Sequence, residues 1–312
     1  MLKPILSCAL SLAVAVGPLL NVTTPSSSQA GDPPLLTIQK TRREVQLEFH
    51  IFLDGRAIRN VQRNQIVVYQ DGKQVTEITG FYEEQDLPLQ LVLMIDTSAS
   101  MTKEFAPEQA AAMGFLRRMT RLVTDQSMVV AFSTHATLNP SLDGSAPASF
   151  RQIALLRPAG LTALFDSICE VSARISESSP QSGRSRNVLI LLSDGADTYS
   201  LNSLEQAIAA ALDSNLTIYA ITDHAQHKVS RGDINLQKLA AATGGQVFFL
   251  KKFKSTEGTF VELEREIHSQ YTVTFALPGD SCGFHSVRVE TTDPKMQVRS
   301  RGGFYRDCSE HH

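Results

Sequence analysis

The sequence predicts a doubly wound α/β fold with a mostly parallel sheet, flanked by a small antiparallel β domain. Two observations carry this prediction. Between residues 88 and 270, short apolar runs alternate with stretches of helical periodicity, which is the pattern of a parallel sheet covered on both faces. On either side of that region, apolar residues alternate with other residues, which is typical of antiparallel strands.

The central region supplies strands and helices in turn. Five apolar runs are expected to form the sheet: 89–95, 128–132, 188–192, 216–221 and 246–250. Four stripes at helical spacing are expected to cover it: Phe115, Leu116, Met119, Leu122 and Val123; Leu164, Ile168, Val171 and Ile175; Leu204, Ile208 and Leu212; and Phe260, Leu263 and Ile267. In such a fold the ligand site lies at the carboxyl ends of the strands.

The flanks read as further strands, at residues 45–53, 66–69, 73–76, 271–277 and 287–291. The dipeptide Asp71-Gly72 is a hairpin signal. Because a lone hairpin is marginal in water, we expect residues 40–85 and 271–307 to meet in one small β-sandwich.

The first 30 residues have the pattern of a secretory signal peptide: Lys3, an apolar stretch over 5–20, and a small-residue cleavage site ending at Ala30. We therefore expect a secreted or periplasmic protein. No later stretch is apolar enough to span a membrane, and the net charge of −3 gives no reason to expect nucleic-acid binding. The predicted division is 1–30 signal peptide, 31–85 N-terminal β segment, 86–270 α/β domain and 271–312 C-terminal β segment.

Oxygen-bearing side chains gather where two central strands end. Asp96, Ser98 and Ser100 directly follow the run 89–95, and Asp194 comes two residues after the end of the run 188–192. Magnesium prefers near-octahedral oxygen ligands at about 2.0–2.1 Å and few direct carboxylates. We therefore expect both serines to ligate directly and both aspartates to hold bound waters. Such residues also serve as turn and cap formers, but their order along the chain favours a metal site.

The run 96–100, the loop residue Thr162 and Asp194 together resemble the metal-ion-dependent adhesion site of von Willebrand factor type A domains. The resemblance implies a bound Mg²⁺, or Mn²⁺ or Ca²⁺, with one position open for an Asp or Glu side chain of a partner protein. It makes Thr162 a switchable ligand, direct in a high-affinity state and water-mediated in a resting state. Ala99 replaces a frequent glycine, and no oxygen ligand is lost.

The mature chain also resembles bacterial secreted proteins related to von Willebrand factor A domains, of the acidobacterial type. The matching segments are 53–55, 67–72, 94–98, 239–245 and 270–271. This resemblance implies no defined biological role.

Three cysteines remain after signal removal, an odd count for an oxidising compartment. We expect Cys282 and Cys308 to pair, because both lie in the polar C-terminal region. Cys169 lies on a helical stretch and is expected to be a free, buried thiol.

Other motifs favour plain interpretations. The tripeptide 231–233, Arg-Gly-Asp, is read as part of a polar loop rather than an adhesion signal, and His224 with His227 lack a third zinc ligand nearby. A Gly-x-Ser-x-Gly match at 279–283 precedes a β pattern rather than the helix that a nucleophile elbow needs.

Three classes of function are thus considered. The leading one is a non-enzymatic, metal-dependent protein-binding module, with no catalytic residue predicted. The second is a structural component of an envelope assembly, in which the metal only rigidifies loops. The third is a phosphotransfer or hydrolase enzyme. Its strand-end nucleophile would be Asp96, but Ser98 stands where a second acid is needed.

Overall fold

A computed structural model describes residues 44–83, 87–103, 105–119, 125–138, 151, 153–178, 185–222, 229–250, 256–276 and 282–306. By their contacts they belong to one unit, Arg42–His312. The predicted signal peptide, His224, His227 and Cys308 lie outside the described residues. No helix in the described ranges has the length and apolar character needed to cross a membrane.

The central sheet has six strands in the order β11-β10-β9-β6-β7-β8. Their bounds are β6 (Leu89–Asp96), β7 (Gln126–Phe132), β8 (Ala136–Leu138), β9 (Arg186–Leu192), β10 (Leu216–Thr222) and β11 (Val247–Phe249). All neighbours are parallel except β7 and β8. The predicted fold class is therefore confirmed, and each of the five predicted central strands is present.

Strand β6 shows why its sequence is apolar throughout. All eight of its residues are buried. Leu91 and Leu93 belong to the core on one face of the sheet, and Val92 and Met94 to the core on the other. Burying a large aliphatic side chain contributes about 1.5–3 kcal/mol to stability. The burial of this strand therefore holds the residues at its end in place.

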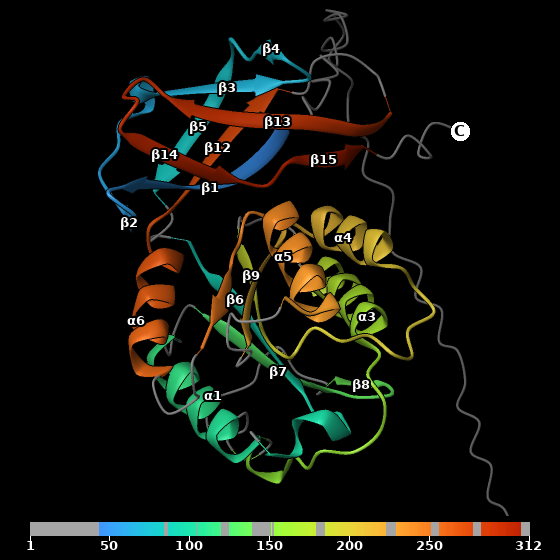
Figure 1. The fold of residues 1–312 in the computed structure, drawn as a ribbon. Coiled ribbons are helices and arrows are strands. Elements are labelled where there is room, and N and C mark those ends of the chain that lie inside the picture. The colour runs from blue at the N-terminus through green and yellow to red at the C-terminus, as the bar shows by residue number, and fades with distance from the viewer. Residues whose placement is uncertain are drawn as a thin grey trace, which may run out of the picture. The chain divides into compact units, whose positions relative to one another are not determined.

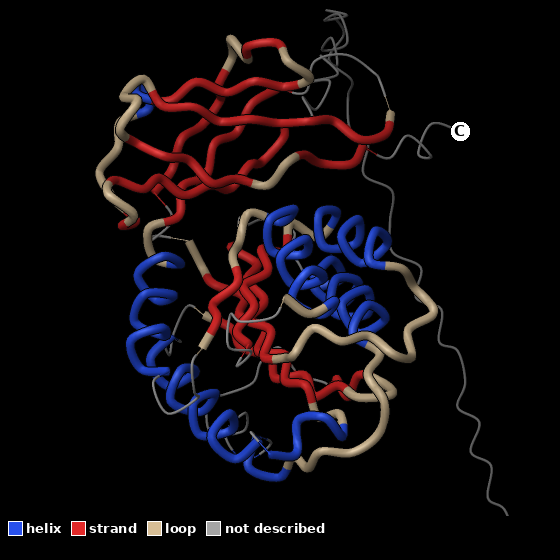
Figure 2. The backbone as a smooth tube through the Cα atoms, viewed as in Figure 1, coloured by secondary structure: helices blue, strands red, loops and turns tan. Residues whose placement is uncertain are grey.

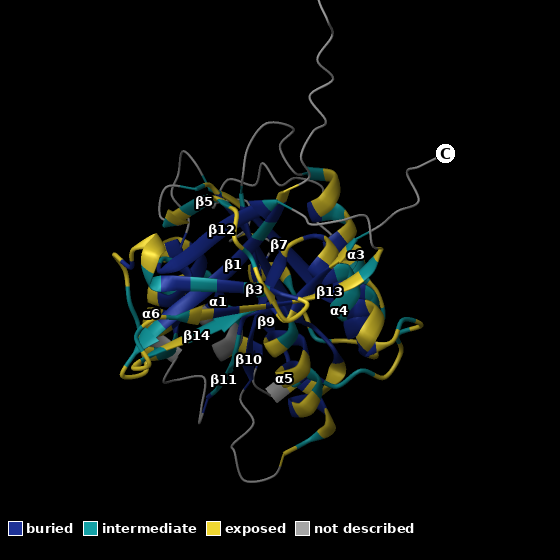
Figure 3. Cartoon of the chain, turned by 90° about the horizontal axis from the view of Figure 1, so that it is seen from above, coloured by how far each residue is buried: buried dark blue, intermediate teal, exposed yellow. Residues whose placement is uncertain are grey.

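Helices cover both faces of the sheet (Figure 1). Helices α1 (Phe105–Met119) and α6 (Thr256–Ile267) pack on one face, and α3 (Leu164–Ser178), α4 (Leu204–Asp213) and α5 (Arg231–Thr243) on the other. Figure 3 shows the strands as buried and the outer faces of the helices as exposed. The stripe predicted to reach Val123 lies in α1 up to Met119, and residues 120–124 fall outside the described part.

Helix α5 begins at the Arg-Gly-Asp tripeptide, so the expectation of a polar loop there is wrong. Ser230 caps the helix: its Oγ accepts a hydrogen bond from the Asp233 N–H at 2.9 Å, and Asp233 Oδ2 accepts one from the Ser230 N–H at 2.7 Å. Leu236 and Leu239 bury the inner face. The helix was missed because its first turn is polar and its apolar stripe is short; the capping-box pattern Ser-x-x-Asp was the available signal.

The remaining strands form two antiparallel sheets, drawn with the rest of the backbone in Figure 2. One has the order β14-β1-β12-β5 with β2 beside β1, and the other β15-β13-β3-β4. Their bounds are β1 (Glu44–Leu53), β2 (Arg56–Ala57), β3 (Ile66–Gln70), β4 (Lys73–Gln74), β5 (Ile78–Glu83), β12 (Gln270–Ala276), β13 (Gly283–Thr291), β14 (Met296–Ser300) and β15 (Gly303–Arg306), with a short 3₁₀ turn, η1 (Arg63–Gln65), before β3.

Strands from both ends of the chain pair within these sheets, as β1 does with β12 and β3 with β13. Alternate residues of both sheets, among them Leu47, Val68, Val273 and Val289, share one apolar core. Strands β2, β5, β8, β14 and β15 were not predicted. The domain boundaries given above stay a proposal.

Of the described cysteines, Cys169 on α3 is free and Cys282 is disulfide-bonded. Cys169 is half-buried rather than fully buried as predicted, because it lies at the margin of the core under α3. Its thiol pKa is raised by burial and by the nearby Asp166 charge. The partner of Cys282 is not among the described residues, so the pairing with Cys308 stays a prediction.

Candidate metal centre

The predicted site residues lie where the direction of chain winding reverses. The strand order runs from β6 through β7 to one edge and from β9 through β10 to the other, so β6 and β9 flank the topological switch point of the sheet. Asp96 is the last residue of β6, and Asp194 follows the end of β9. In open α/β sheets, ligands bind in the crevice outside the strand ends at this point.

Asp96 is a buried carboxylate with a hydrogen bond on each oxygen. Its side chain is 0% exposed. Oδ1 accepts a hydrogen bond from the Ser98 N–H at 2.8 Å, and Oδ2 accepts one from the Ser193 hydroxyl at 2.7 Å. Burial raises the pKa of Asp96 to about 6; the hydrogen bonds from Ser98 and Ser193 oppose the rise, and the charge of Asp194 adds to it. A cation nearby would remove the cost of keeping both carboxylates charged.

Ser98 and Ser100 present a pair of hydroxyl oxygens 2.9 Å apart. The 3₁₀ turn η3 (Ala99–Lys103) begins between them and brings Ser100 back toward Ser98. Adjacent ligands of an octahedral magnesium ion at about 2.0–2.1 Å lie about 2.8–3.0 Å apart, since that distance is √2 times the metal–oxygen distance. The two hydroxyls thus fit neighbouring positions in the coordination sphere of a small hard cation.

Thr162 is held between the two other loops of the site. Its N–H donates to the Thr198 hydroxyl at 3.0 Å, and its carbonyl oxygen accepts from the N–H groups of Thr198 and Tyr199 at 2.8 and 3.0 Å. Ala159 N–H donates to the Thr97 carbonyl oxygen at 2.7 Å, which ties the same loop to the end of β6. All these bonds of Thr162 use its backbone, so its buried side chain, 4% exposed, keeps its hydroxyl for another ligand.

Asp194 is half-buried, and its Oδ1 accepts a hydrogen bond from the Ala196 N–H at 2.9 Å. The other oxygen is available to a bound water. Within the described ranges, no group of three or more His, Cys, Asp or Glu side chains is placed to hold a metal. The donor set of hydroxyl oxygens and two carboxylates that the sequence predicted stays a prediction.

Sequence reasoning missed two supporting residues. Ser193 bridges the site, since its hydroxyl donates to Asp96 and accepts from the Gly195 N–H at 3.0 Å. Asp197 Oδ1 accepts from the Leu164 N–H at 2.8 Å, so it caps α3 directly after the Thr162 loop. Ser193 precedes Asp194 directly and Asp197 follows it by three residues, but Asp96 and Leu164, which they contact, lie far away along the chain. Only the fold therefore reveals their roles.

The Arg-Gly-Asp tripeptide cannot serve as an exposed adhesion signal in this fold. Asp233 is 3% exposed and is committed to the cap of α5. Most of the Gly-x-Ser-x-Gly match, residues 279–281, lies outside the described part.

The family model described as "von Willebrand factor type A domain" matches residues 90–262. A comparison with curated proteins found no match. The match at 90–262 contains all five predicted site residues.

Among solved structures, the chain is similar to proximal thread matrix protein 1 from the mussel byssus with a zinc-occupied MIDAS motif, at 18% identity and a TM-score of 0.49, covering 63% of this chain and 49% of that one. It is also similar to a von Willebrand factor type A protein from Catenulispora acidiphila, at 16% identity and a TM-score of 0.48, covering 86% and 74%. The PilB minor pilin from Streptococcus sanguinis, as a D319A mutant, gives 14% identity and a TM-score of 0.46, covering 72% and 78%. The chain spans about half the length of the mussel proteins it matches. At these identities, the family assignment rests on the family model.

Proposed function

Because the chain belongs to the von Willebrand factor type A family, we propose that it is a non-enzymatic binding module that captures an acidic side chain of a partner protein through a divalent cation. We further propose that it acts outside the cytoplasm, after removal of residues 1–30. Magnesium is the preferred ion on the chemistry of the donor set, with Mn²⁺ and Ca²⁺ as alternatives.

The observation that carries the proposal is the burial of Asp96 beside a second carboxylate. A fully buried Asp with a pKa raised to about 6 and an acidic neighbour is a costly arrangement for a protein without a counter-ion. The hydroxyl pair at 2.9 Å supplies two neutral ligands beside it. With so little anionic charge in direct contact, the bound ion keeps its attraction for an incoming carboxylate.

Each residue has a distinct role in this proposal. Ser98 and Ser100 bind the ion directly, and Thr162 joins them when a partner is engaged. Asp96 and Asp194 hold the ion's water ligands, since both oxygens of Asp96 already accept protein hydrogen bonds and each keeps a second lone pair for water. The remaining coordination position receives an Asp or Glu of the partner.

Retention of proteins from envelope extract on the immobilised mature chain tests the proposal. With Mg²⁺ we expect one or more extract proteins to be retained, and we expect chelator to release them. Asp96→Ala should abolish retention, whereas Asp213→Ala, which removes an exposed carboxylate at the end of α4, should not.

Other outcomes favour the other classes of function. Retention that is the same in Mg²⁺, in chelator and in Asp96→Ala would favour a structural component of an envelope assembly. Metal-dependent turnover of phosphoesters by the wild type, lost in Asp96→Ala, would favour an enzyme.

A further inference from the structure

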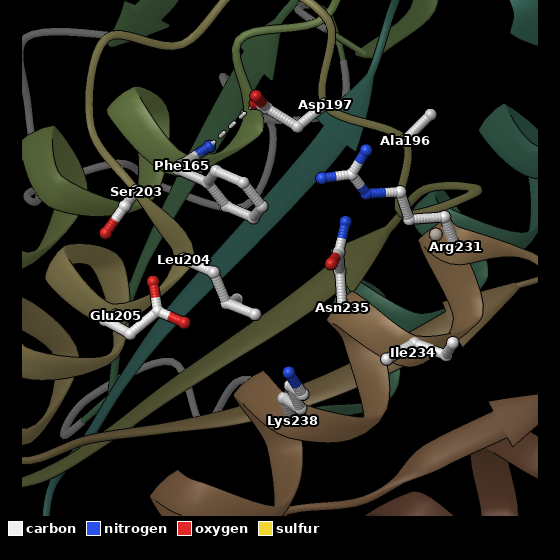
Figure 4. A pocket seen from close by; sticks show the side chains of 11 residues that line it. Phe165, Ala196, Asp197, Ser203, Leu204, Glu205, Arg231, Ile234, Asn235 and Lys238 are labelled. Carbon is white, nitrogen blue, oxygen red and sulfur yellow. Dashed lines mark hydrogen bonds between the residues drawn. The ribbon is translucent and has the colours of Figure 1, made fainter.

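A pocket of about 610 Å³ lies between α4 and α5, beside the loop that carries Asp194 (Figure 4). Residues from four segments line it: Phe165 from the start of α3, Ala196 and Asp197 from that loop, Leu204 and Glu205 from the start of α4, and the first two turns of α5. None of the five residues assigned to the metal centre lines this pocket.

The pocket lies close to the metal centre. Ala196 is two residues after Asp194, so their Cα atoms are at most about 8 Å apart. Gly232, which lines the pocket, packs against the backbone of Asp194, and the Asn235 amide donates to the Gly195 carbonyl oxygen at 3.1 Å. A polypeptide with one side chain at the metal therefore has its neighbouring residues within reach of the pocket.

Two acids, Asp197 and Glu205, and two cations, Arg231 and Lys238, line the pocket, so its formal charges balance. The acids nevertheless have other partners. Asp197 is committed to capping α3. Hydrogen bonds from its own backbone N–H and from Ser203 hold the pKa of Glu205 below its ordinary value, and the positive charge of Lys238 across the pocket contributes to this. Glu205 and Lys238 thus balance each other.

Arg231, the first residue of α5, is exposed, and its side chain makes no ion pair or hydrogen bond with any described residue. In Figure 4 its guanidinium extends over the pocket toward Ala196 and Asn235. Phe165, Leu204 and Ile234 supply apolar surface below it. An arginine above apolar walls suits a carboxylate on a short aliphatic stem, because the guanidinium can bind both oxygens at once.

We propose that this pocket binds a second acidic side chain of the same partner segment whose first carboxylate is captured at the metal centre, with Arg231 as its counter-ion. The inference rests on the proposed function and gives the partner a spacing. The Cα atoms of Asp194 and the pocket residue Ala196 are at most about 8 Å apart, and an extended chain advances about 3.3–3.6 Å per residue, so we set the separation of the two acids at about two to four residues. The metal alone would bind any accessible acidic side chain. The pocket favours partner segments that carry a second acid at the matching separation.

Binding of the full chain to an array of immobilised synthetic peptides tests the inference. Each peptide is a Gly/Ser host with one of three inserts: one Glu, two Glu separated by one to eight residues, or one Glu and one Lys at the same separations. Binding is measured in Mg²⁺ and in chelator. Arg231→Glu is the test variant; an acid in the first turn of a helix is favourable, so the fold should persist, as a thermal melt will show. Arg265→Glu, an exposed residue of α6 outside the pocket, is the matched control.

In Mg²⁺, the wild type should bind two-Glu peptides with a separation of two to four residues about tenfold more tightly than one-Glu peptides. Without a second site, two equivalent carboxylates would raise the affinity only about twofold, whatever their separation. Arg231→Glu should lose the tenfold gain and prefer the matching Glu–Lys peptides, whereas Arg265→Glu should behave as the wild type.

The inference is overturned if the gain does not depend on separation, or if Arg231→Glu and Arg265→Glu bind alike. Either result leaves metal-dependent binding of one-Glu peptides, and with it the proposed function, in place. An absence of Mg²⁺-dependent binding to every Glu peptide would instead count against both.

Discussion

Gly232, at the start of α5, packs directly against the backbone of Asp194. A Cβ atom on Gly232 would overlap the carbonyl oxygen of Asp194 and lie 2.8 Å from the carbonyl carbon of Gly195. A Cβ on Gly195, which has a φ of +74°, would in turn overlap the carbonyl oxygen of Gly232. Two glycines therefore determine how closely α5 approaches the metal centre.

Gly232→Ala should damage both the fold and the site, because the added methyl group must push the Asp194 backbone away. We expect the free energy of unfolding to fall by roughly 1–3 kcal/mol, the usual cost of overpacking, and the affinity for Mg²⁺ to fall as Asp194 moves. Thermal melts and magnesium titration calorimetry measure the two effects. Gly114→Ala in α1 is the control: its Cβ meets nothing within 4 Å, so it should stabilise the helix slightly. Equal behaviour of the two variants would show that the close packing is unimportant.

The raised pKa of Asp96 predicts a pH dependence that metal reverses. The folded-state pKa is about 6 and the ordinary value is 3.8, so between these values the native state holds the proton more tightly than the unfolded chain. Without metal, this contribution to stability is present below about pH 4 and is lost as the pH rises through about 6. Magnesium binds beside the charged form, so its stabilisation should grow over the same range.

Melting temperatures from pH 4 to 7.5, in Mg²⁺ and in chelator, measure this dependence. The side chain in Asp96→Asn cannot titrate. Its melting temperature should therefore neither fall with rising pH in chelator nor increase when Mg²⁺ is added. If the gap between the two curves for the wild type were as wide at pH 4 as at pH 7.5, Asp96 would not be coupled to the metal.

Ser193→Ala should weaken the site without removing any predicted ligand. The variant deprives Asp96 Oδ2 of its 2.7 Å hydrogen bond and leaves a buried acceptor unpaired, which costs about 1–3 kcal/mol of stability. Because that bond lowers the pKa of Asp96, the pH at which Mg²⁺ begins to stabilise the protein should rise. Ser185→Ala, outside the site, is a suitable control, and an unshifted pH midpoint in Ser193→Ala would contradict the bridging role.

The mature chain should carry one free thiol, that of Cys169. Cys282 is disulfide-bonded, and we expect its partner to be Cys308. In the chain-entropy model, a disulfide that closes a loop of this size stabilises the folded state by roughly 3–4 kcal/mol. Thiol titration of denatured, unreduced mature protein should give one thiol per chain, and Cys282→Ser should give two. Three thiols in the wild type would exclude the link.

The sequence predicted the elements that depend on local pattern. Strands buried on both faces, such as β6, must be apolar at every position, so they stand out as runs. Candidate oxygen donors can also be proposed from the sequence, since Asp96, Ser98 and Ser100 follow one another at the end of one strand. Helix α5 was not visible as a helix, because its burial depends on Leu236 and Leu239 meeting a sheet that the local sequence does not describe.

The rest of the site depends on contacts between distant segments. The bond from Ser193 to Asp96 joins residues 97 positions apart. The approach of Gly232 to Asp194 is likewise set by the packing of α5 on the sheet, and nothing in the local sequence of either residue indicates it. Tertiary packing therefore supplies what the local pattern lacks: the orientation of the donors and the pocket beside them.

Thr162→Ala separates metal binding from partner capture. If Thr162 ligates the ion only when a partner carboxylate is bound, its loss should lower Mg²⁺ affinity little, because Ser98 and Ser100 remain, but should reduce capture of an acidic partner about tenfold or more. Its backbone bonds to Thr198 and Tyr199 do not involve the side chain, so the loop should keep its place. Thr162→Ser, which restores the hydroxyl, should recover capture. Magnesium calorimetry beside metal-dependent pull-downs measures both quantities, and an equal loss of the two in Thr162→Ala would make Thr162 a permanent ligand rather than a switch.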